Sequence, residues 1–399
     1  MKLFAQHGFG PGDKIANGVR EQSLDGVIFS ARYERQDKLE NDVSEIKDVS
    51  SDTEFLLDPE IYACFYAHMP DSQLGQLTEW DFFRAYQRSQ LEDTATIENV
   101  LSNTFASMID LPLTSIIAPN IFIPTSFNSI EAVVAKNFIR RTMPVFSKTG
   151  DNRKVFATLA IGRDALLNRT EFEAFLNDIT ALDNPPDGFY LLVGGGMTEE
   201  RTDITRSEIM HADVIAGWML LNFTLNINGF KVINGSSDIL TPFLGSAGGY
   251  AGATGWWSNL RMFSINRYIR SGGGGRLPVV RYLSNFILNR IKFDEREAIS
   301  VLLPEVNNSL PHDTDYESGE PKRKIEVLQT WEAIKQLNTQ MIDNDVNVSL
   351  QNLENAIIRA DTAYARLSGA GFALDIETNR EYIAALQEGL KTFKQLAEI

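Results

Sequence analysis

The sequence predicts an α/β fold, specifically a (β/α)8 barrel of the TIM type with a C-terminal helical extension. Short β-type runs alternate with helical patterns over residues 1–305, which is typical of βα units around a parallel sheet. The chain has 399 residues, 43% of them hydrophobic, enough to bury one barrel with an appendage or two ordinary domains. An open, doubly wound sheet would produce a similar local pattern and is the alternative.

The strands are expected where short apolar or β-branched runs end at turn residues. They are residues 26–30, 54–58, 115–123, 155–161, 189–194 and 231–233, with less regular runs at 252–256 and 277–280. Helical apolar spacing falls between them, at residues 38–49, 95–109, 130–145, 171–182 and 208–225. Capping boxes, Thr170 with Glu173 and Thr205 with Glu208, indicate two helix starts.

The chain changes character after residue 305. Residues 306–324 are polar and contain prolines, a glycine and several acids, so we expect an exposed linker or loop there. Amphipathic helices are then expected at 325–342, 349–367 and 379–397. The expected organisation is a catalytic barrel (1–305), a linker (306–324) and a helical extension (325–399).

Composition excludes several classes of protein. The start of the chain has no signal-peptide pattern, and the longest apolar stretch, residues 214–227, is shorter than a bilayer span, so we expect a buried helix and no membrane partner. The single cysteine, Cys64, excludes an internal disulfide framework, so a cytoplasmic protein is expected. The four scattered histidines show no metal-ligand spacing, and no P-loop or dinucleotide fingerprint is present, so neither metal nor cofactor is expected.

The net charge is −16, but its distribution is uneven. No acidic residue occurs between Asp238 and Asp294, and arginines alternate with aromatic residues in that window. Aromatic rings stack on unpaired bases while guanidinium groups hold phosphates, which suits a nucleic-acid surface. The alternative is an arginine-rich face that pairs with the acidic remainder of the same chain.

Chemistry in such a barrel is expected at the carboxyl ends of its strands, which face a common mouth. Asp58 ends the run Phe-Leu-Leu-Asp-Pro-Glu, where it could act as a nucleophile or general base, or cap the following helix. Gly194 and Gly195 end a later strand, where they could let a flat ligand approach the backbone or simply form a tight turn.

The order of these pieces resembles the tRNA-guanine transglycosylase barrel, including its DNA-directed relatives that exchange or excise bases. The resemblance rests on residues 55–58, on 156–162 with 187–195, and on 252–261, and it spans approximately residues 20–295. The family's second aspartate is replaced around Thr254 and Gly255, and its zinc-binding cysteines are missing. The resemblance therefore implies hydrolytic base excision with one carboxylate, without a metal or organic cofactor.

This resemblance implies a set of site residues. Asp58 would be the catalytic carboxylate. The extruded base would lie among Asn120, Asp164, Gly194, Gly195, Tyr250, Trp256 and Trp257. The nucleic-acid backbone would contact Arg32, Arg261, Arg267, Arg270, Arg276 and Arg281.

The expected function is that of a DNA glycosylase, a hydrolase that flips and removes a modified base, with DNA preferred over RNA and a role in antiviral defence. Two alternatives stay open. One is a non-catalytic nucleic-acid-binding or assembly protein. The other is a barrel enzyme that acts on a small phosphorylated or nucleoside substrate.

Overall fold

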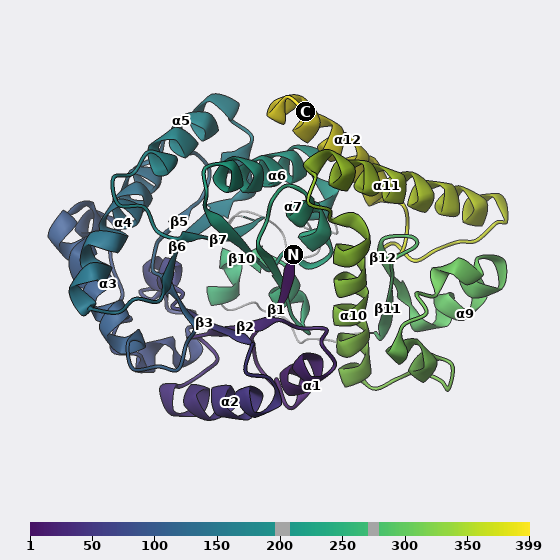
Figure 1. Cartoon of the computed structure of the whole chain (residues 1–399), viewed down its shortest axis with the longest axis horizontal. Helices are drawn as coiled ribbons and strands as arrows, with labels where there is room; N and C mark the ends of the chain where they lie inside the picture. Colours follow the sequence, from purple (N-terminus) through teal and green to yellow (C-terminus); the bar gives the residue numbers. More distant parts are fainter. Residues whose placement is uncertain (196–207, 270–278) are drawn as a thin grey trace.

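The computed structural model describes residues 1–195, 208–269 and 279–399, and it confirms an α/β barrel of parallel strands surrounded by helices (Figure 1). Eight strands lie side by side in the order β3-β2-β1-β9-β8-β7-β6-β4. They are β1 (Lys2–Gln6), β2 (Gly26–Ser30), β3 (Glu54–Asp58), β4 (Ser115–Ala118), β6 (Lys154–Gly162), β7 (Gly188–Gly195), β8 (Lys231–Gly235) and β9 (Ala251–Thr254).

The ring is nearly closed between β3 and β4 by one residue. The Thr114 amide donates to the Phe55 carbonyl at 2.9 Å, and the Phe55 amide donates to the Thr114 hydroxyl at 2.8 Å. These bonds satisfy backbone groups that would otherwise form open sheet edges. Two short strands, β5 (Phe122–Ile123) and β10 (Phe263–Ser264), extend the sheet by pairing with β6 and β7.

The first barrel strand differs from the expectation. It is β1, a five-residue run directly after Met1 that is not among the expected strands. The expected strand at 277–280 does not complete the barrel: residues 277 and 278 lie outside the described residues, and Val279 and Val280 are not in a strand. The other expected strands are confirmed within a few residues, although the run at 115–123 divides into β4 and β5.

Helices pack around the barrel, largely where apolar spacing predicted them (Figure 1). They are α1 (Lys14–Arg20), α2 (Gln36–Val49), α3 (Thr94–Met108), α4 (Ile130–Phe146), α5 (Arg169–Thr180), α6 (Ala212–Ile227) and α7 (Thr241–Ser246). The capping residue of α5 is Asn168, which accepts from the Glu171 amide, rather than Thr170. Thr205, expected to cap α6, lies outside the described residues.

Helix α10 (Arg323–Met341) belongs to this ring. It packs against α1, α7 and β1, the place of the helix that follows the last strand of such a barrel (Figure 1). Its Trp331 is fully buried and meets α1 at Gly18. The expected extension from residue 325 therefore begins with a helix that packs as part of the barrel.

The chain between β9 and α10 forms an insertion. It contains α8 (Ser258–Arg261), the antiparallel hairpin β11 (Arg281–Ser284) and β12 (Asn289–Lys292), and α9 (Phe293–Leu302). The segment expected as an exposed linker contributes to this packing, because a 3-10 helix at Pro311–Tyr316 buries Asp313 and Tyr316. Asp313 accepts a hydrogen bond from the Tyr282 hydroxyl at 2.9 Å.

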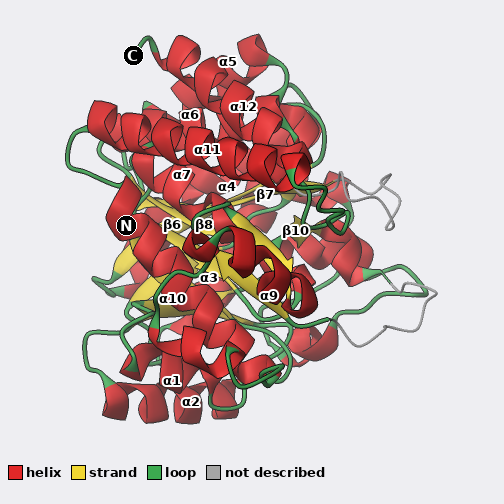
Figure 2. Cartoon of the chain, turned by 90° about the vertical axis from the view of Figure 1, so that its right-hand side faces the viewer, coloured by secondary structure: helices red, strands yellow, loops and turns green. Residues whose placement is uncertain are grey.

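The last two helices form an outer layer. Helix α12 (Glu381–Ala397) packs on α6, and α11 (Val346–Gly369) packs on α12 and α7. Figure 2 shows both on the side of the sheet opposite α1 and α2. Among the described residues, no helix combines the length and hydropathy needed to span a bilayer.

The contact between α1 and α10 yields a test of the ring. A Cβ at position 18 would lie 2.8 Å from both the Trp331 ring and Leu24. We expect Gly18→Ala to lower the free energy of unfolding by about 1–3 kcal/mol through overpacking, despite the roughly 1 kcal/mol advantage of Ala in a helix. Chemical denaturation measures this. Gly369→Ala is the matched control, because no atom lies within 4 Å of its added Cβ; equal stability of the two variants would contradict the packing argument.

Candidate active site at the barrel mouth

Polar side chains gather where the strands end. Gln6 ends β1, Ser30 ends β2 and Asp58 ends β3, and each of the three residues is at most 3% exposed. Because the strands are parallel, these ends meet at one mouth. We call the following residues the mouth cluster: Gln6, Ser30, Asp58, Glu60, Tyr62, Tyr190 and Tyr268.

Asp58 is held by neutral donors. The Tyr62 hydroxyl donates to its Oδ2 at 2.8 Å, and the Glu60 amide donates to its Oδ1 at 3.0 Å. The hydroxyl of Tyr190, from β7, is a further hydrogen-bonding partner. The bond from the Glu60 amide corresponds to the capping role that the sequence suggests for Asp58. The tyrosine contacts come from the turn after β3 and from β7.

Glu60 lies beside Asp58, beyond Pro59. Its carboxylate accepts from the hydroxyls of Ser30 and Tyr268, so both of its oxygens are bonded. The guanidinium of Arg32 stacks on the ring of Tyr268, 5.1 Å from its centroid, and Arg267 also interacts electrostatically with Glu60. Two guanidinium groups therefore lie around the tyrosine hydroxyls that bond the two carboxyl groups.

The environment of Asp58 favours its protonated form. Burial, followed by the nearby charge of Glu60, raises the pKa of Asp58 to about 7. Burial also raises the pKa of Tyr62 and Tyr190 well above the usual value, so both hydroxyls stay protonated and remain donors. Asp58 can therefore both release and accept a proton near neutral pH.

Backbone strain also gathers at the mouth. Glu60 has a φ of 51°, Ser236 of 51° and Asp238 of 43°, values that residues other than glycine rarely adopt. Glu60 follows β3, and the other two follow β8. Each such conformation costs on the order of 1–3 kcal/mol and is often found at functional sites.

Some buried polar groups near the strand ends have bonding capacity left. Gln6 Oε1 and Ser236 Oγ have no hydrogen-bond partner among the described residues. The amide nitrogen of Gln6 donates to the Tyr190 hydroxyl at 3.4 Å, which connects it to the mouth cluster. A Cβ on Gly235 would lie 2.7 Å from the same hydroxyl, so Tyr190 packs closely against the end of β8.

A histidine borders the cluster. His7 follows β1 and is 1% exposed, and its Nε2 lies 3.2 Å from Glu34 Oε2. Lys38 Nζ lies 2.7 Å from the same oxygen and 3.2 Å from Asp42. The histidine and the two carboxylates could together ligate a metal ion, but the lysine ammonium already supplies a cation to both carboxylates.

Several residues expected to bind a base serve the fold. Gly194 and Gly195 pair with β10, and a Cβ on Gly194 would lie 1.9 Å from the Phe263 carbonyl oxygen. The close backbone approach predicted for a ligand is thus made by the chain itself. The Asn120 amide donates to the carbonyl of Thr158 at 2.8 Å, and its oxygen accepts from the Ile121 amide.

The aromatic candidates do not converge on Asp58. Tyr250 precedes β9 and contacts Lys2 and Glu54, which begin β1 and β3, so it lies at the opposite end of the barrel. Trp256 is 1% exposed and donates to the Phe9 carbonyl at 2.8 Å. The position of Tyr250 contradicts the expectation that it stacks on a base beside Asp58, whereas Trp256 follows β9 on the mouth side and stays a prediction.

Two further candidates lie at the surface of the mouth loops. The indole of Trp257 is partly buried and donates to the Phe9 carbonyl at 3.0 Å. Asp164 is exposed in the turn after β6. Neither residue has a contact with the mouth cluster among those the structure describes.

The basic stretch is largely neutralised within the chain. Arg290 makes a two-oxygen contact with Asp238 at 2.6 and 2.7 Å. Arg281 pairs with Glu377, and Arg261 lies 3.8 Å from Glu326. The alternative of an arginine-rich face paired with the chain's own acids therefore describes these residues.

The remaining arginine candidates divide between the mouth and the undescribed segments. Arg267 donates to the carbonyls of Ser264 and Met262, and Arg32 is 8% exposed with Nη1 lacking a partner among the described residues. Arg270 and Arg276 lie outside the described residues.

The sequence predicts Asp58 as a site residue but not most of its neighbours. Glu60 and Tyr62, which follow it directly in the chain, are not among the predicted site residues. The doublet of carboxylates around Pro59, at the end of an apolar strand, was the available signal. Tyr190 and Tyr268 could not be assigned to this cluster, because only folding brings β7 and the segment after β10 to β3.

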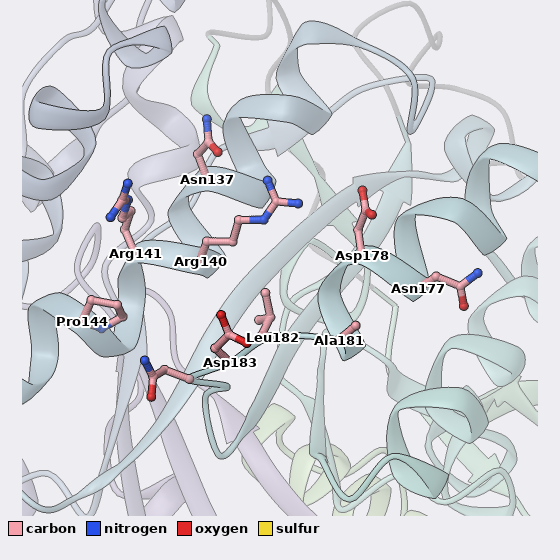
Figure 3. Close-up of a pocket in the computed structure, with 10 residues that line it drawn as sticks. Asn137, Arg140, Arg141, Pro144, Asn177, Asp178, Ala181, Leu182 and Asp183 are labelled. Atoms are coloured by element: carbon pink, nitrogen blue, oxygen red, sulfur yellow. The ribbon is translucent and has the colours of Figure 1, made fainter.

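A depression lies outside the barrel (Figure 3). It is a groove of about 520 Å³ between α4 and α5, with Arg140 and Asn137 from α4 and Asp178 from α5 among its lining residues. The groove lies toward the carboxyl ends of both helices, which precede the starts of β6 and β7. It is therefore away from the mouth, where chemistry in this fold is concentrated.

Known proteins show only weak similarity to this chain. No protein-family model and no curated protein match the chain. Among solved structures, it is similar to a fungal multi-domain GH3 β-N-acetylglucosaminidase with a GCN5-related glucosamine N-acetyltransferase region (TM-score 0.41, 10% identity, 91% of this chain and 42% of that one). It is also similar to the carboxyl transferase domain of Rhizobium etli pyruvate carboxylase (TM-score 0.32, 10% identity, 99% and 60%). The chain spans less than two thirds of either, and at these scores neither likeness indicates a function.

The buried Asp58 carboxyl predicts a pH-dependent stability. Its pKa is raised on folding, so its stabilising contribution is present below the unfolded pKa near 4 and is lost as pH rises through about 7. We expect Asp58→Asn, which removes this ionisation, to gain about 2–3 kcal/mol relative to the native chain between pH 5 and pH 8. Denaturant titration at both pH values measures the difference. The exposed Asp52→Asn is the control, and a pH-independent difference for Asp58→Asn would contradict the assignment.

Proposed function

We propose that the chain is a hydrolase that cleaves a glycosidic bond at the barrel mouth, with Asp58 as the proton-transferring group. The observation that carries the proposal is the buried pair Asp58 and Glu60 at the end of β3, surrounded by tyrosine hydroxyls. Enzymes that hydrolyse glycosides usually have two carboxyl groups in different environments, because one transfers a proton while the other stays ionised.

The two carboxyls are suited to different roles. Asp58 contacts neutral donors, and burial raises its pKa to about 7. It can protonate a leaving group at or below neutral pH. Glu60 accepts hydrogen bonds from Ser30 and Tyr268 with both carboxylate oxygens, and in this proposal it stabilises the positive charge that develops on the sugar. Water then adds to the sugar and returns a proton to Asp58, which completes the hydrolysis.

The N-glycosidic bond of a nucleobase is the form of this reaction that the sequence resemblance suggests. The distribution of charge favours a small substrate such as a nucleoside over a nucleic-acid polymer. The reason is the charge: Arg261, Arg281 and Arg290 interact with acids of the chain, and a nucleic-acid backbone requires several available cations. Excision of a modified base from DNA is a more specific version of this reaction, and DNA with modified bases is therefore one of the substrates to be tested.

The test compares three substrate classes: nucleosides, DNA containing modified or unmodified bases, and aryl glycosides. Release of base or aglycone and formation of alkali-labile sites are measured. We expect one class to be hydrolysed and Asp58→Asn to lower kcat by about 10²–10⁴-fold. If Asp58 acts as the acid, kcat of the native chain should fall above pH 7, and this dependence should be lost in the variant.

Asp52→Asn, a substitution on the turn before β3, is the control and should keep full activity. Hydrolysis that survives Asp58→Asn unchanged would reject the assignment of the residue. Absence of hydrolysis of all three classes would reject the proposed reaction. Salt-sensitive DNA binding without chemistry would support instead the non-catalytic nucleic-acid-binding alternative.

A further inference from the structure

A histidine and three carboxylates meet on the outside of the barrel. Glu21 follows the end of α1, His312 and Asp315 lie in the 3-10 helix of the insertion, and Glu332 lies in α10. We call these four residues the His312 cluster. Glu21 precedes β2 in the chain, so the cluster lies toward the end of the barrel opposite the mouth.

The donor atoms are close enough to share one ion. His312 Nε2 lies 3.2 Å from Glu21 Oε2 and 3.8 Å from Glu332 Oε1, and one donor atom from each of the three residues lies within 4.8 Å of the others. With bonds of about 2.0–2.2 Å, donors on one zinc ion are separated by roughly 3–3.5 Å. A small side-chain adjustment of Glu332 would bring all three donors to such distances.

The other ring nitrogen of His312 has the partner that a metal ligand needs. Nδ1 lies 2.9 Å from Asp315 Oδ2. A histidine that binds a metal usually donates its second N–H to a carboxylate, which fixes the tautomer and presents a lone pair on the other nitrogen. Here that lone pair on Nε2 would be directed at Glu21 and Glu332.

The charge of the His312 cluster is not compensated by a basic side chain. Among the described residues, no Lys or Arg forms an ion pair with Glu21, Asp315 or Glu332. The side chain of Glu332 is only 9% exposed, so water screens its charge weakly. Three carboxylates thus surround one imidazole.

The cluster at His7 supplies an internal comparison. There the histidine also meets two carboxylates, Glu34 and Asp42, but Lys38 contacts both of them. In the His312 cluster no lysine or arginine among the described residues pairs with the carboxylates. The two clusters therefore differ in whether a basic side chain already occupies the space between the carboxylates.

We propose that His312, Glu21 and Glu332 bind a divalent transition-metal ion, with Asp315 orienting the imidazole. One nitrogen and two carboxylate oxygens suit Zn²⁺ or Mn²⁺ better than Mg²⁺ or Ca²⁺, which prefer oxygen ligands alone. The ion would connect α1, the insertion and α10, so its role is structural. It would hold the insertion against the ring at the place where α10 completes the barrel.

The test uses the full chain after removal of metals with a chelator. We expect Zn²⁺ to raise the melting temperature saturably, and Co²⁺ to give a visible absorption band typical of a nitrogen and oxygen site. Glu21→Gln, a change on a partly exposed side chain that should not impair folding, should weaken Zn²⁺ binding on the order of tenfold or more. His312→Ala should abolish the Co²⁺ band, and binding should weaken as pH falls because protons compete for the ligands.

His68→Ala, on an exposed histidine, is the matched control and should bind both ions like the native chain. The proposal is overturned if calorimetry detects no saturable Zn²⁺ binding, or if Glu21→Gln and His312→Ala bind as the native chain does. Stabilisation on lowering the pH, without any effect of Zn²⁺, would also overturn it, since a protonated His312 would then be the cation.

Discussion

The burial of two carboxyl groups at the end of β3 is the constraint on which the candidate site depends. Removing ionised groups from water is costly unless hydrogen bonds or opposite charges replace the lost hydration. The chain supplies hydrogen-bond donors to both groups: Asp58 receives hydroxyl and amide donors, and Glu60 receives two hydroxyl donors. Burial and the charge of Glu60 nevertheless raise the pKa of Asp58 to about 7, which gives the site a group that can transfer a proton near neutral pH.

The same constraint explains how the mouth is covered. Tyr62 comes from the turn after β3 and Tyr268 from the segment after β10, and their rings make an edge-to-face contact with centroids 6.0 Å apart. The pairing of β10 with Gly194 and Gly195 places that second segment over the strand ends. The glycines thus serve the site indirectly, by admitting a backbone that carries one of its hydroxyl donors.

The ring of helices around the barrel is completed by α10, which lies far along the chain from the last barrel strand, β9. An insertion with its own hairpin separates β9 from α10, yet α10 packs on α1 and β1. Arginines of the insertion pair with acids from distant segments, such as Arg290 with Asp238 and Arg281 with Glu377. Part of the acidic surplus of the sequence therefore forms ion pairs with the arginines of the basic stretch.

The sequence by itself determined the barrel class, most of its strands and helices, and the position of Asp58 at a strand end, because these follow from local periodicity and from apolar runs that stop at turn residues. Only the tertiary structure decided that β1 is the first strand, that α10 completes the ring, and that Tyr190 and Tyr268 surround the carboxyls while Tyr250 lies at the far end. Contacts between residues distant in the chain depend on strand order and loop paths, and local spacing contains no information about either.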